Sequence, residues 1–203
     1  LPDEVLIQCK RVCVVACGTA MHVGLITQAL VKSILHMHID VELASEFMYS
    51  DPVIDENTLV IAVSQSGETV DTLEAVKYAK KCGATCLAVL NVRGSSISRV
   101  SDYVLYTEAG PEIAVASTKA YTSQVVLLSI LGIYFAEKMQ TVDKNTIDNF
   151  KADILKISEK YGYSRISIII LPLISSPKYS QKTRASSGSR QSEGNELIAT
   201  FSV

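Results

Sequence analysis

Three hydroxyl side chains, a carboxamide and a glycine are crowded into the segment Ser64-Gln65-Ser66-Gly67-Glu68-Thr69. An apolar run precedes this segment, and a helical pattern follows it. Glycine permits a tight backbone path, and backbone amides at the start of a helix lack partners within the helix. The helix dipole adds about half a positive charge there. Together these features predict a cradle for a phosphate group, built from neutral donors because the segment contains no Lys or Arg.

This segment does not fit the two best-known phosphate loops. It lacks the GK[ST] ending of the P-loop and the GxGxxG spacing of the dinucleotide-binding turn. Ser and Thr in front of a helix are also ordinary N-caps, which is the structural alternative for each hydroxyl. Three hydroxyls, a Gln and a Gly within six residues after a buried strand nevertheless favour a ligand site.

Two other turns carry hydroxyl groups near the start of a predicted helix. Cys17-Gly18-Thr19-Ala20 follows the first predicted strand and by itself is typical of an N-cap, but it would lie beside the first turn in a parallel sheet. Residues 112–122 form the third turn, in which Ser117 could serve either as a cap or as a ligand contact. The three histidines and five cysteines show no metal-ligand spacing, so we expect no metal site.

The elements that must position these turns alternate between strands and helices. We expect strands at Arg11–Ala16, Ile39–Leu43, Leu59–Val63, Thr85–Leu90 and Tyr103–Tyr106, and helices at His22–Leu35, Val70–Cys82, Thr118–Lys138 and Asp143–Tyr161. This alternation predicts an α/β fold with a five-stranded parallel sheet covered by helices on both faces. In such sheets ligands bind outside the carboxyl ends of the strands, where the three turns would lie.

Composition narrows the class of protein. The 203 residues are 48% hydrophobic with a formal net charge of -2, which does not indicate a nucleic-acid or membrane surface. The longest apolar candidate, Val125–Ala136, is too short to span a bilayer and fits a core helix. An odd number of cysteines without a secretory signal indicates a cytoplasmic setting.

The end of the chain changes character. Residues 162–174 include an apolar run that could form an extra strand. Residues 175–203 are rich in Ser, Lys, Arg and Gln without a sustained period, and we expect disorder there.

Three motifs resemble those of the glutamine–fructose-6-phosphate aminotransferase family, in the first of its two sugar-isomerase (SIS) subdomains. The resemblance is carried by ACGTAMH at 16–22, SQSGETVDT at 64–72 and AGPEIAVASTKAYT at 109–122, and it extends over residues 1–161. It implies a three-layer SIS fold. Three residues depart from the common pattern of the family, namely Ala20, Met48 and Ala114.

The resemblance also implies a ligand, fructose 6-phosphate or glucosamine 6-phosphate, bound without a metal or organic cofactor. Ser64, Gln65, Ser66 and Thr69 would hold the phosphate, and Thr19, Val115 and Ser117 would contact the sugar. The family is dimeric through its isomerase domains. It takes ammonia from glutamine and makes glucosamine 6-phosphate.

The catalytic groups of the family have no counterpart in this sequence. They belong to an N-terminal glutaminase domain and to the second SIS subdomain, so we assign no catalytic residue and expect a truncated chain that is inactive alone. The alternative is a non-catalytic SIS module that senses sugar phosphates for a partner.

Overall fold

The computed structural model describes residues 1–111 and 117–161. It contains five parallel strands, in the order β2-β1-β3-β4-β5 across the sheet. The strands are β1 (Arg11–Ala16), β2 (Asp40–Leu43), β3 (Thr58–Ser64), β4 (Thr85–Leu90) and β5 (Tyr103–Tyr106). The predicted five-stranded parallel sheet is therefore confirmed.

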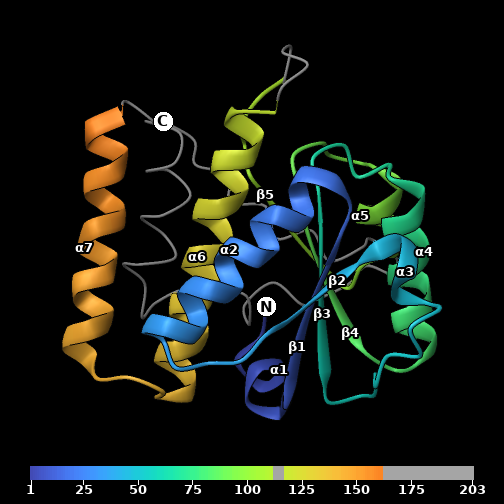
Figure 1. Cartoon of the computed structure of the whole chain (residues 1–203), viewed down its shortest axis with the longest axis horizontal. Coiled ribbons are helices and arrows are strands. Elements are labelled where there is room, and N and C mark those ends of the chain that lie inside the picture. The colour runs from blue at the N-terminus through green and yellow to red at the C-terminus, as the bar shows by residue number, and fades with distance from the viewer. Residues whose placement is uncertain (112–116, 162–203) are drawn as a thin grey trace, which may run out of the picture.

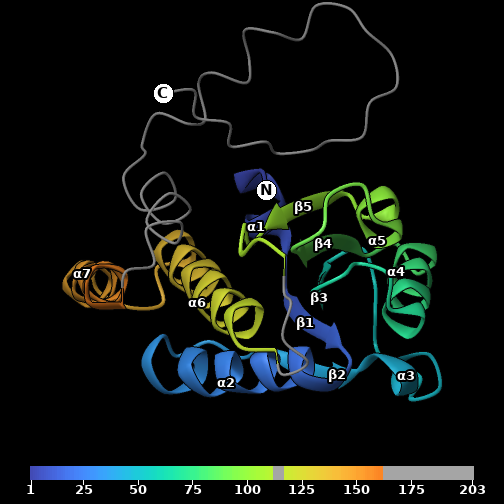
Figure 2. The same ribbon diagram turned by 90° about the horizontal axis from the view of Figure 1, so that it is seen from above.

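Helices cover both faces of this sheet, as Figures 1 and 2 show. The helices are α1 (Asp3–Gln8), α2 (Gly18–Ile34), α3 (Ala44–Phe47), α4 (Val70–Lys81), α5 (Ser96–Val100), α6 (Lys119–Met139) and α7 (Lys144–Tyr161). One face carries α1, α2 and α6, with α7 packed outside α6, and the other face carries α3, α4 and α5. The predicted three layers are confirmed.

The central strands supply both hydrophobic cores because successive side chains point to opposite faces. In β3, Leu59, Ile61 and Val63 face the α2–α6 side, whereas Val60 and Ala62 face the α4 side. Every residue of β3 is buried. This double burial explains why the strands read as continuous apolar runs in the sequence.

Helix α6 is long and apolar enough to cross a membrane by length and composition alone. Its bounds agree to within one residue with the predicted helix Thr118–Lys138, and the apolar run Val125–Ala136 lies inside it. Most of its surface is buried against α2, α1 and α7. That burial is what a core helix of a layered fold requires.

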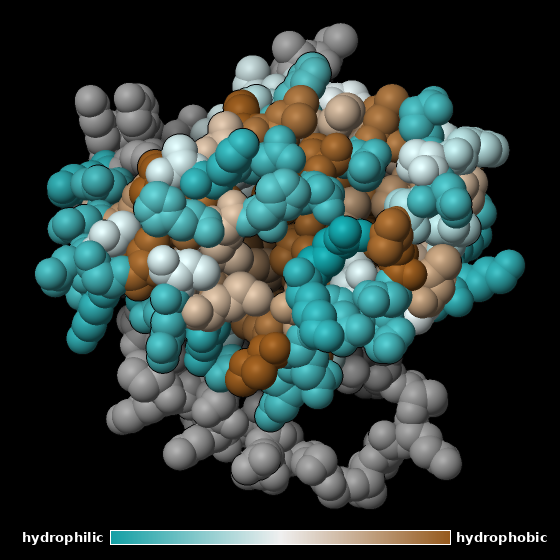
Figure 3. Space-filling view, turned by 60° about the horizontal axis from the view of Figure 1, so that its bottom comes forward, coloured by the Kyte–Doolittle hydropathy of each residue, from teal (hydrophilic) through white to brown (hydrophobic). Residues whose placement is uncertain are grey.

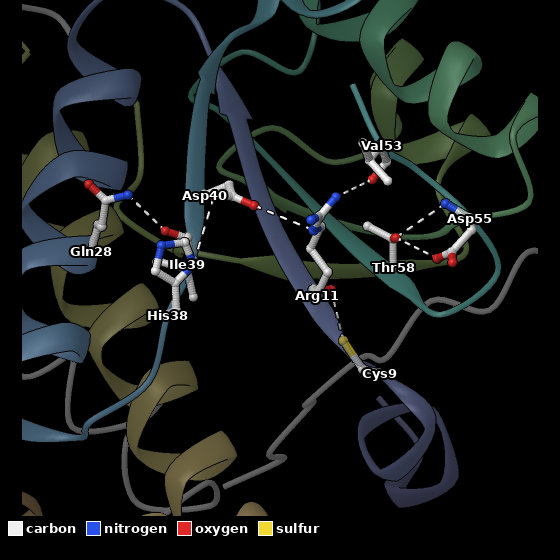
Figure 4. Close-up of polar contacts among 9 residues, drawn as sticks. All are labelled: Cys9, Arg11, Gln28, His38, Ile39, Asp40, Val53, Asp55 and Thr58. Atoms are coloured by element: carbon white, nitrogen blue, oxygen red, sulfur yellow. Dashed lines mark hydrogen bonds and ion pairs between the residues drawn. The ribbon is translucent and has the colours of Figure 1, made fainter. Parts of the chain in front are cut away.

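Side chains at the amino ends of β1 and β3 are tied into local contacts, shown in Figure 4. The Arg11 guanidinium donates to the Val53 carbonyl at 2.7 Å and lies 3.7 Å from the Asp40 carboxylate. The hydroxyl of Thr58 donates to Asp55 at 2.8 Å, and this bond is the main reason that the pKa of Asp55 is lowered. These contacts fix the sheet at the end opposite to the predicted ligand turns.

The surface is mixed in polarity, with hydrophobic residues showing between hydrophilic ones in Figure 3. Large exposed apolar side chains include Leu25 and Ile26 on α2 and Val70 at the start of α4. The predicted extra strand at 162–174, the predicted disorder at 175–203 and Val115 all lie outside the described residues.

Candidate functional site

A cavity of about 270 Å³ lies at the carboxyl ends of β1 and β3. The strand order reverses direction at these two strands, since α2 leaves β1 toward one face and α4 leaves β3 toward the other. Such a reversal is where open α/β sheets bind their ligands. The residues that line the cavity are Cys17, Gly18, Thr19, Ala20, Val63, Ser64, Gln65, Ser66, Thr69, Ser117 and Gln124.

Six of the seven residues predicted from the sequence share this cavity. Their side chains come from three different turns, those after β1 and β3 and the one before α6. The seventh, Val115, is outside the described residues. The six residues are Thr19, Ser64, Gln65, Ser66, Thr69 and Ser117.

The turn after β3 is organised by its own hydroxyl groups. The Gly67 amide donates to Ser64 Oγ at 3.1 Å, and the Glu68 amide donates to Ser66 Oγ at 3.2 Å. Neither amide belongs to the first turn of α4, because α4 begins only at Val70. Because the two seryl oxygens accept these bonds, their own protons are left to point elsewhere.

Thr69 is the N-cap residue of α4, yet its side chain makes no capping hydrogen bond. Its Oγ1 instead lies 3.1 Å from Ser64 Oγ. An ordinary cap would turn this hydroxyl onto the amides of the first turn. The cap alternative therefore does not account for the side chain of Thr69, although the residue occupies the cap position.

Gly67 has a φ of +67°, a conformation that other residues adopt only with strain. Its neighbour across the turn is Ser95, and a Cβ on Gly67 would lie 2.1 Å from Ser95 Oγ and 2.6 Å from Ser95 Cβ. No larger residue fits unless this contact gives way. Glycine is thus required at this position for two reasons, namely the left-handed backbone conformation and the lack of room for a Cβ beside Ser95.

The loop after β4 supports the cradle from outside. The Ile97 amide donates to the Gly67 carbonyl at 3.0 Å, and the Ser96 amide donates to the Glu68 carboxylate at 2.7 Å. Hydrogen bonding from Ser96, first from its side chain and then from its backbone amide, lowers the pKa of Glu68. Glu68 therefore braces the turn and is turned away from the cavity lining.

Asn91 connects the cradle to the loop that leads toward Ser117. Its backbone amide donates to the Gln65 carbonyl at 3.1 Å. Its side-chain oxygen accepts from the Thr107 hydroxyl and from the Ala109 backbone amide, each at 2.9 Å. Its side-chain nitrogen donates to the Gly110 carbonyl at 2.8 Å. Sequence reasoning missed Asn91, because a lone Asn after a strand carries no sign of these partners.

On the other side of the cavity, α6 begins at Lys119 with Thr118 as its N-cap residue, so Ser117 is not the cap. Gln124, in the second turn of α6, was also missed from the sequence. It is 3% exposed and lines the cavity. Cys17 is the one thiol in the lining, and its sulfur lies 3.9 Å from both Asp71 and Thr72.

The described lining has no Lys, Arg, His, Asp or Glu, so its donors are neutral. Within residues 1–111 and 117–161 there is also no group of three or more His, Cys, Asp or Glu that could hold a metal ion. What the arrangement offers is a set of hydroxyls, amides and carboxamides around a small hollow. Such groups can donate hydrogen bonds to an oxygen-rich anion, but none of them is an obvious general acid or base.

A larger hollow of about 520 Å³ lies at the amino ends of β4 and β5. Its charged groups already have partners, because Lys80 pairs with Asp102 at 2.7 Å and Asp102 accepts the Cys86 amide at 2.8 Å. None of the predicted site residues lines it. We therefore assign the functional site to the smaller cavity.

Comparisons with known proteins show the family of the chain. Residues 5–134 match the model of the SIS domain. The chain is 50% identical over 150 residues to a glutamine–fructose-6-phosphate aminotransferase (isomerizing) of Clostridium acetobutylicum, covering 74% of this chain and 25% of that protein. The corresponding protein of Clostridium tetani is 49% identical over 160 residues, covering 79% and 26%. The chain thus spans about a quarter of the length of these curated relatives.

A solved structure supports the same relationship. The C-terminal domain of glucosamine-fructose-6-phosphate aminotransferase from Francisella tularensis superposes with a TM-score of 0.74 at 33% identity, covering 85% of this chain and 49% of that one. The parallel sheet, the cavity where its strand order reverses and the match over residues 5–134 lead to one conclusion: the chain belongs to the SIS domain family.

Proposed function

We propose that this chain binds fructose 6-phosphate as the isomerase portion of a glutamine-dependent aminotransferase that makes glucosamine 6-phosphate. The observation that carries the proposal is the meeting of six predicted residues from three turns around one cavity. The similarity to aminotransferases of this name supports the choice of ligand. A dimer in the full-length enzyme, a cytoplasmic location and the lack of nucleic-acid or membrane partners stay predictions.

In this proposal the turn after β3 holds the phosphate. A phosphomonoester is close to dianionic at neutral pH. The hydroxyls of Ser64, Ser66 and Thr69 would donate to it, and the amino end of α4 would add a favourable dipole. Thr19, Val115 and Ser117 would contact the sugar. With uncharged donors, binding depends only weakly on salt, because few counterions are displaced.

The described lining also suggests that binding and turnover are separable. General acid–base catalysis needs a titratable group beside the reacting atoms. Cys17 is the one titratable side chain in the described lining. We therefore expect no glucosamine 6-phosphate when the purified chain is incubated with fructose 6-phosphate and ammonia, and product formation would contradict this part of the proposal.

Calorimetry with Ser66→Ala and Thr69→Ala tests the cradle. Each change removes one hydrogen bond to a charged acceptor, which contributes roughly 1.5–3 kcal/mol, so the affinity for fructose 6-phosphate should fall about 10- to 100-fold. The melting temperature should hardly move. Ser33→Ala is the matched control, since Ser33 is exposed on α2 and donates only to the Leu30 carbonyl.

Two results would contradict the assignment. The first is unchanged affinity in both cradle variants. The second is binding of free fructose as tightly as fructose 6-phosphate, which would show that the phosphate is not what the site recognises.

A further inference from the structure

Gln124 is the polar side chain of α6 that lacks a partner at the cavity. Its Nε2 is buried and makes no hydrogen bond within the described part of the chain. Other buried polar groups of α6 are satisfied, since the Ser123 hydroxyl donates to the Lys119 carbonyl and the Ser129 hydroxyl to the Val125 carbonyl, each at 2.7 Å. Gln124 differs from them in lining the cavity.

A buried side-chain NH2 group without an acceptor is unfavourable, because the group has left water without gaining a partner. Several neighbours of Gln124 in α6 are apolar, including Leu127 and Leu128. A Gln in this setting therefore calls for a partner that arrives from the cavity. A sugar hydroxyl both donates and accepts hydrogen bonds, so it suits either end of a carboxamide.

The layers indicate which part of the ligand Gln124 meets. The proposed phosphate cradle precedes α4, on one face of the sheet, whereas α6 packs with α2 on the other face. Ser117, which precedes the N-cap residue of α6, and Gln124, within α6, both line the cavity on this side. A ligand whose anion occupies the cradle would extend its other groups toward this side.

We propose that Gln124 is a further ligand-binding residue, whose carboxamide forms a hydrogen bond with a hydroxyl group of the bound phosphorylated sugar. This inference rests on the proposed function, because it takes the phosphate to lie in the cradle. It adds a contact from α6 that none of the three sequence motifs assigned.

The test compares Gln124→Met with Thr141→Val by calorimetry and thermal unfolding of the full chain. Met keeps the length and helix propensity of Gln but removes the amide. Thr141 is the matched control, because its Oγ1 is also buried without a partner in the described residues but lies outside the cavity. Both variants should melt at or slightly above the wild-type temperature, since each removes an unpaired polar group.

The two variants should differ in binding. Gln124→Met should bind fructose 6-phosphate about 10- to 100-fold more weakly, the usual effect of leaving a ligand hydroxyl unpaired, while its affinity for inorganic phosphate stays within about twofold. Thr141→Val should match the wild type with both probes. Gln124→Leu replaces the methionine variant if the latter does not fold.

The inference is overturned if the wild type binds fructose 6-phosphate and Gln124→Met binds it equally well. It is also overturned if the affinity for inorganic phosphate falls as far as that for the sugar phosphate. A wild-type chain that binds neither probe would instead refute the proposed function, and the inference with it, so the two failures are distinguishable.

Discussion

At the scale of single residues, the cradle depends on the contact between Gly67 and Ser95. The glycine combines a left-handed backbone with a neighbour that leaves no room for a Cβ. Gly94 has almost the same φ, +68°, but nothing lies within 4 Å of the position of its Cβ. Comparing substitutions at Gly67 and Gly94 therefore separates the free-energy cost of the backbone conformation from the cost of the steric clash with Ser95.

We predict that Gly67→Ala destabilises the chain more than Gly94→Ala does. Gly94→Ala should cost roughly 1–2 kcal/mol, the penalty of a left-handed conformation, whereas Gly67→Ala adds a steric conflict with Ser95 and should also weaken fructose 6-phosphate binding. Chemical denaturation of both variants measures the difference. Adding Ser95→Gly to Gly67→Ala should recover part of the loss, and equal costs for the two single variants would contradict the clash.

Residue-level prediction from the sequence selected cavity-lining residues where several signals coincide. Ser64, Ser66 and Thr69 stand out because hydroxyls, a glycine and a strand-to-helix boundary occur together, and all three line the cavity. Their role in binding stays a prediction. Gln124 was missed because one Gln inside an apolar helical pattern looks the same whether it faces solvent, a partner or a cavity. The bonds from the Gly67 and Glu68 amides were missed because they depend on where α4 begins.

At the scale of elements, periodicity located the strands well. The bounds of β1, β4 and β5 agree with the predicted ranges, since each is an apolar run bounded by polar residues. Helix α2 begins at Gly18 rather than His22, because Gly, Thr and Ala at its start show no apolar period. The short helices α1, α3 and α5 were missed, as four to six residues are too few to display a helical repeat.

Helix α1 shows how one such short element is held. Its Asp3 accepts hydrogen bonds from Lys138 Nζ and Tyr134 Oη of α6, both at 2.7 Å. The bond from Lys138 is the main cause of the lowered pKa of Asp3. A lowered pKa in the folded state means that the carboxylate stabilises the fold above its unfolded pKa of about 3.9 and loses this effect as the pH falls through the folded value.

We predict that Asp3→Asn lowers the free energy of unfolding at pH 7 by up to about 1 kcal/mol, because the ion pair is partly exposed and screened. The difference from the wild type should shrink as the pH falls below about 4, where the unfolded chain binds the proton first, and should vanish once the folded carboxylate is protonated at its lowered pKa. Urea unfolding at several pH values measures it. Asp153→Asn is the control, since its pair with Lys156 lies within the exposed side of α7. A difference that persists unchanged at low pH would contradict the ionic origin.

At the scale of the whole molecule, the two cores share one sheet, so the cavity is supported from both faces. Cys13 faces one core from β1 and Cys86 faces the same core from β4, and burial raises the pKa of each thiol to about 12. Both thiols belong to the packed core on this face of the sheet. Since β1 and β3 carry both the cores and the cavity, a ligand that binds the folded chain there would stabilise the fold.

The C-terminal boundary of the folded domain lies beyond the end of the SIS match. The match to the SIS domain ends at residue 134, but α7 lies beyond it and packs on α6. Ile147 and Ile154 of α7 are 2% and 6% exposed and belong to the core of the α2–α6 face. We therefore propose that residues 1–161 form the sugar-phosphate-binding domain, with 162–203 outside it.

Two shortened chains test this boundary. A chain ending at Tyr161 should keep the melting temperature and the fructose 6-phosphate affinity of the full chain, because every described element is retained. A chain ending at Gln140 loses α7 and uncovers the part of α6 against which Ile147 and Ile154 pack, which should cost about 1.5–3 kcal/mol for each isoleucine. The melting temperatures of the two shortened chains and of the full chain, each measured with and without fructose 6-phosphate, test these expectations. If the chain ending at Tyr161 fails to fold while the full chain binds ligand, residues beyond 161 belong to the domain and the boundary is wrong.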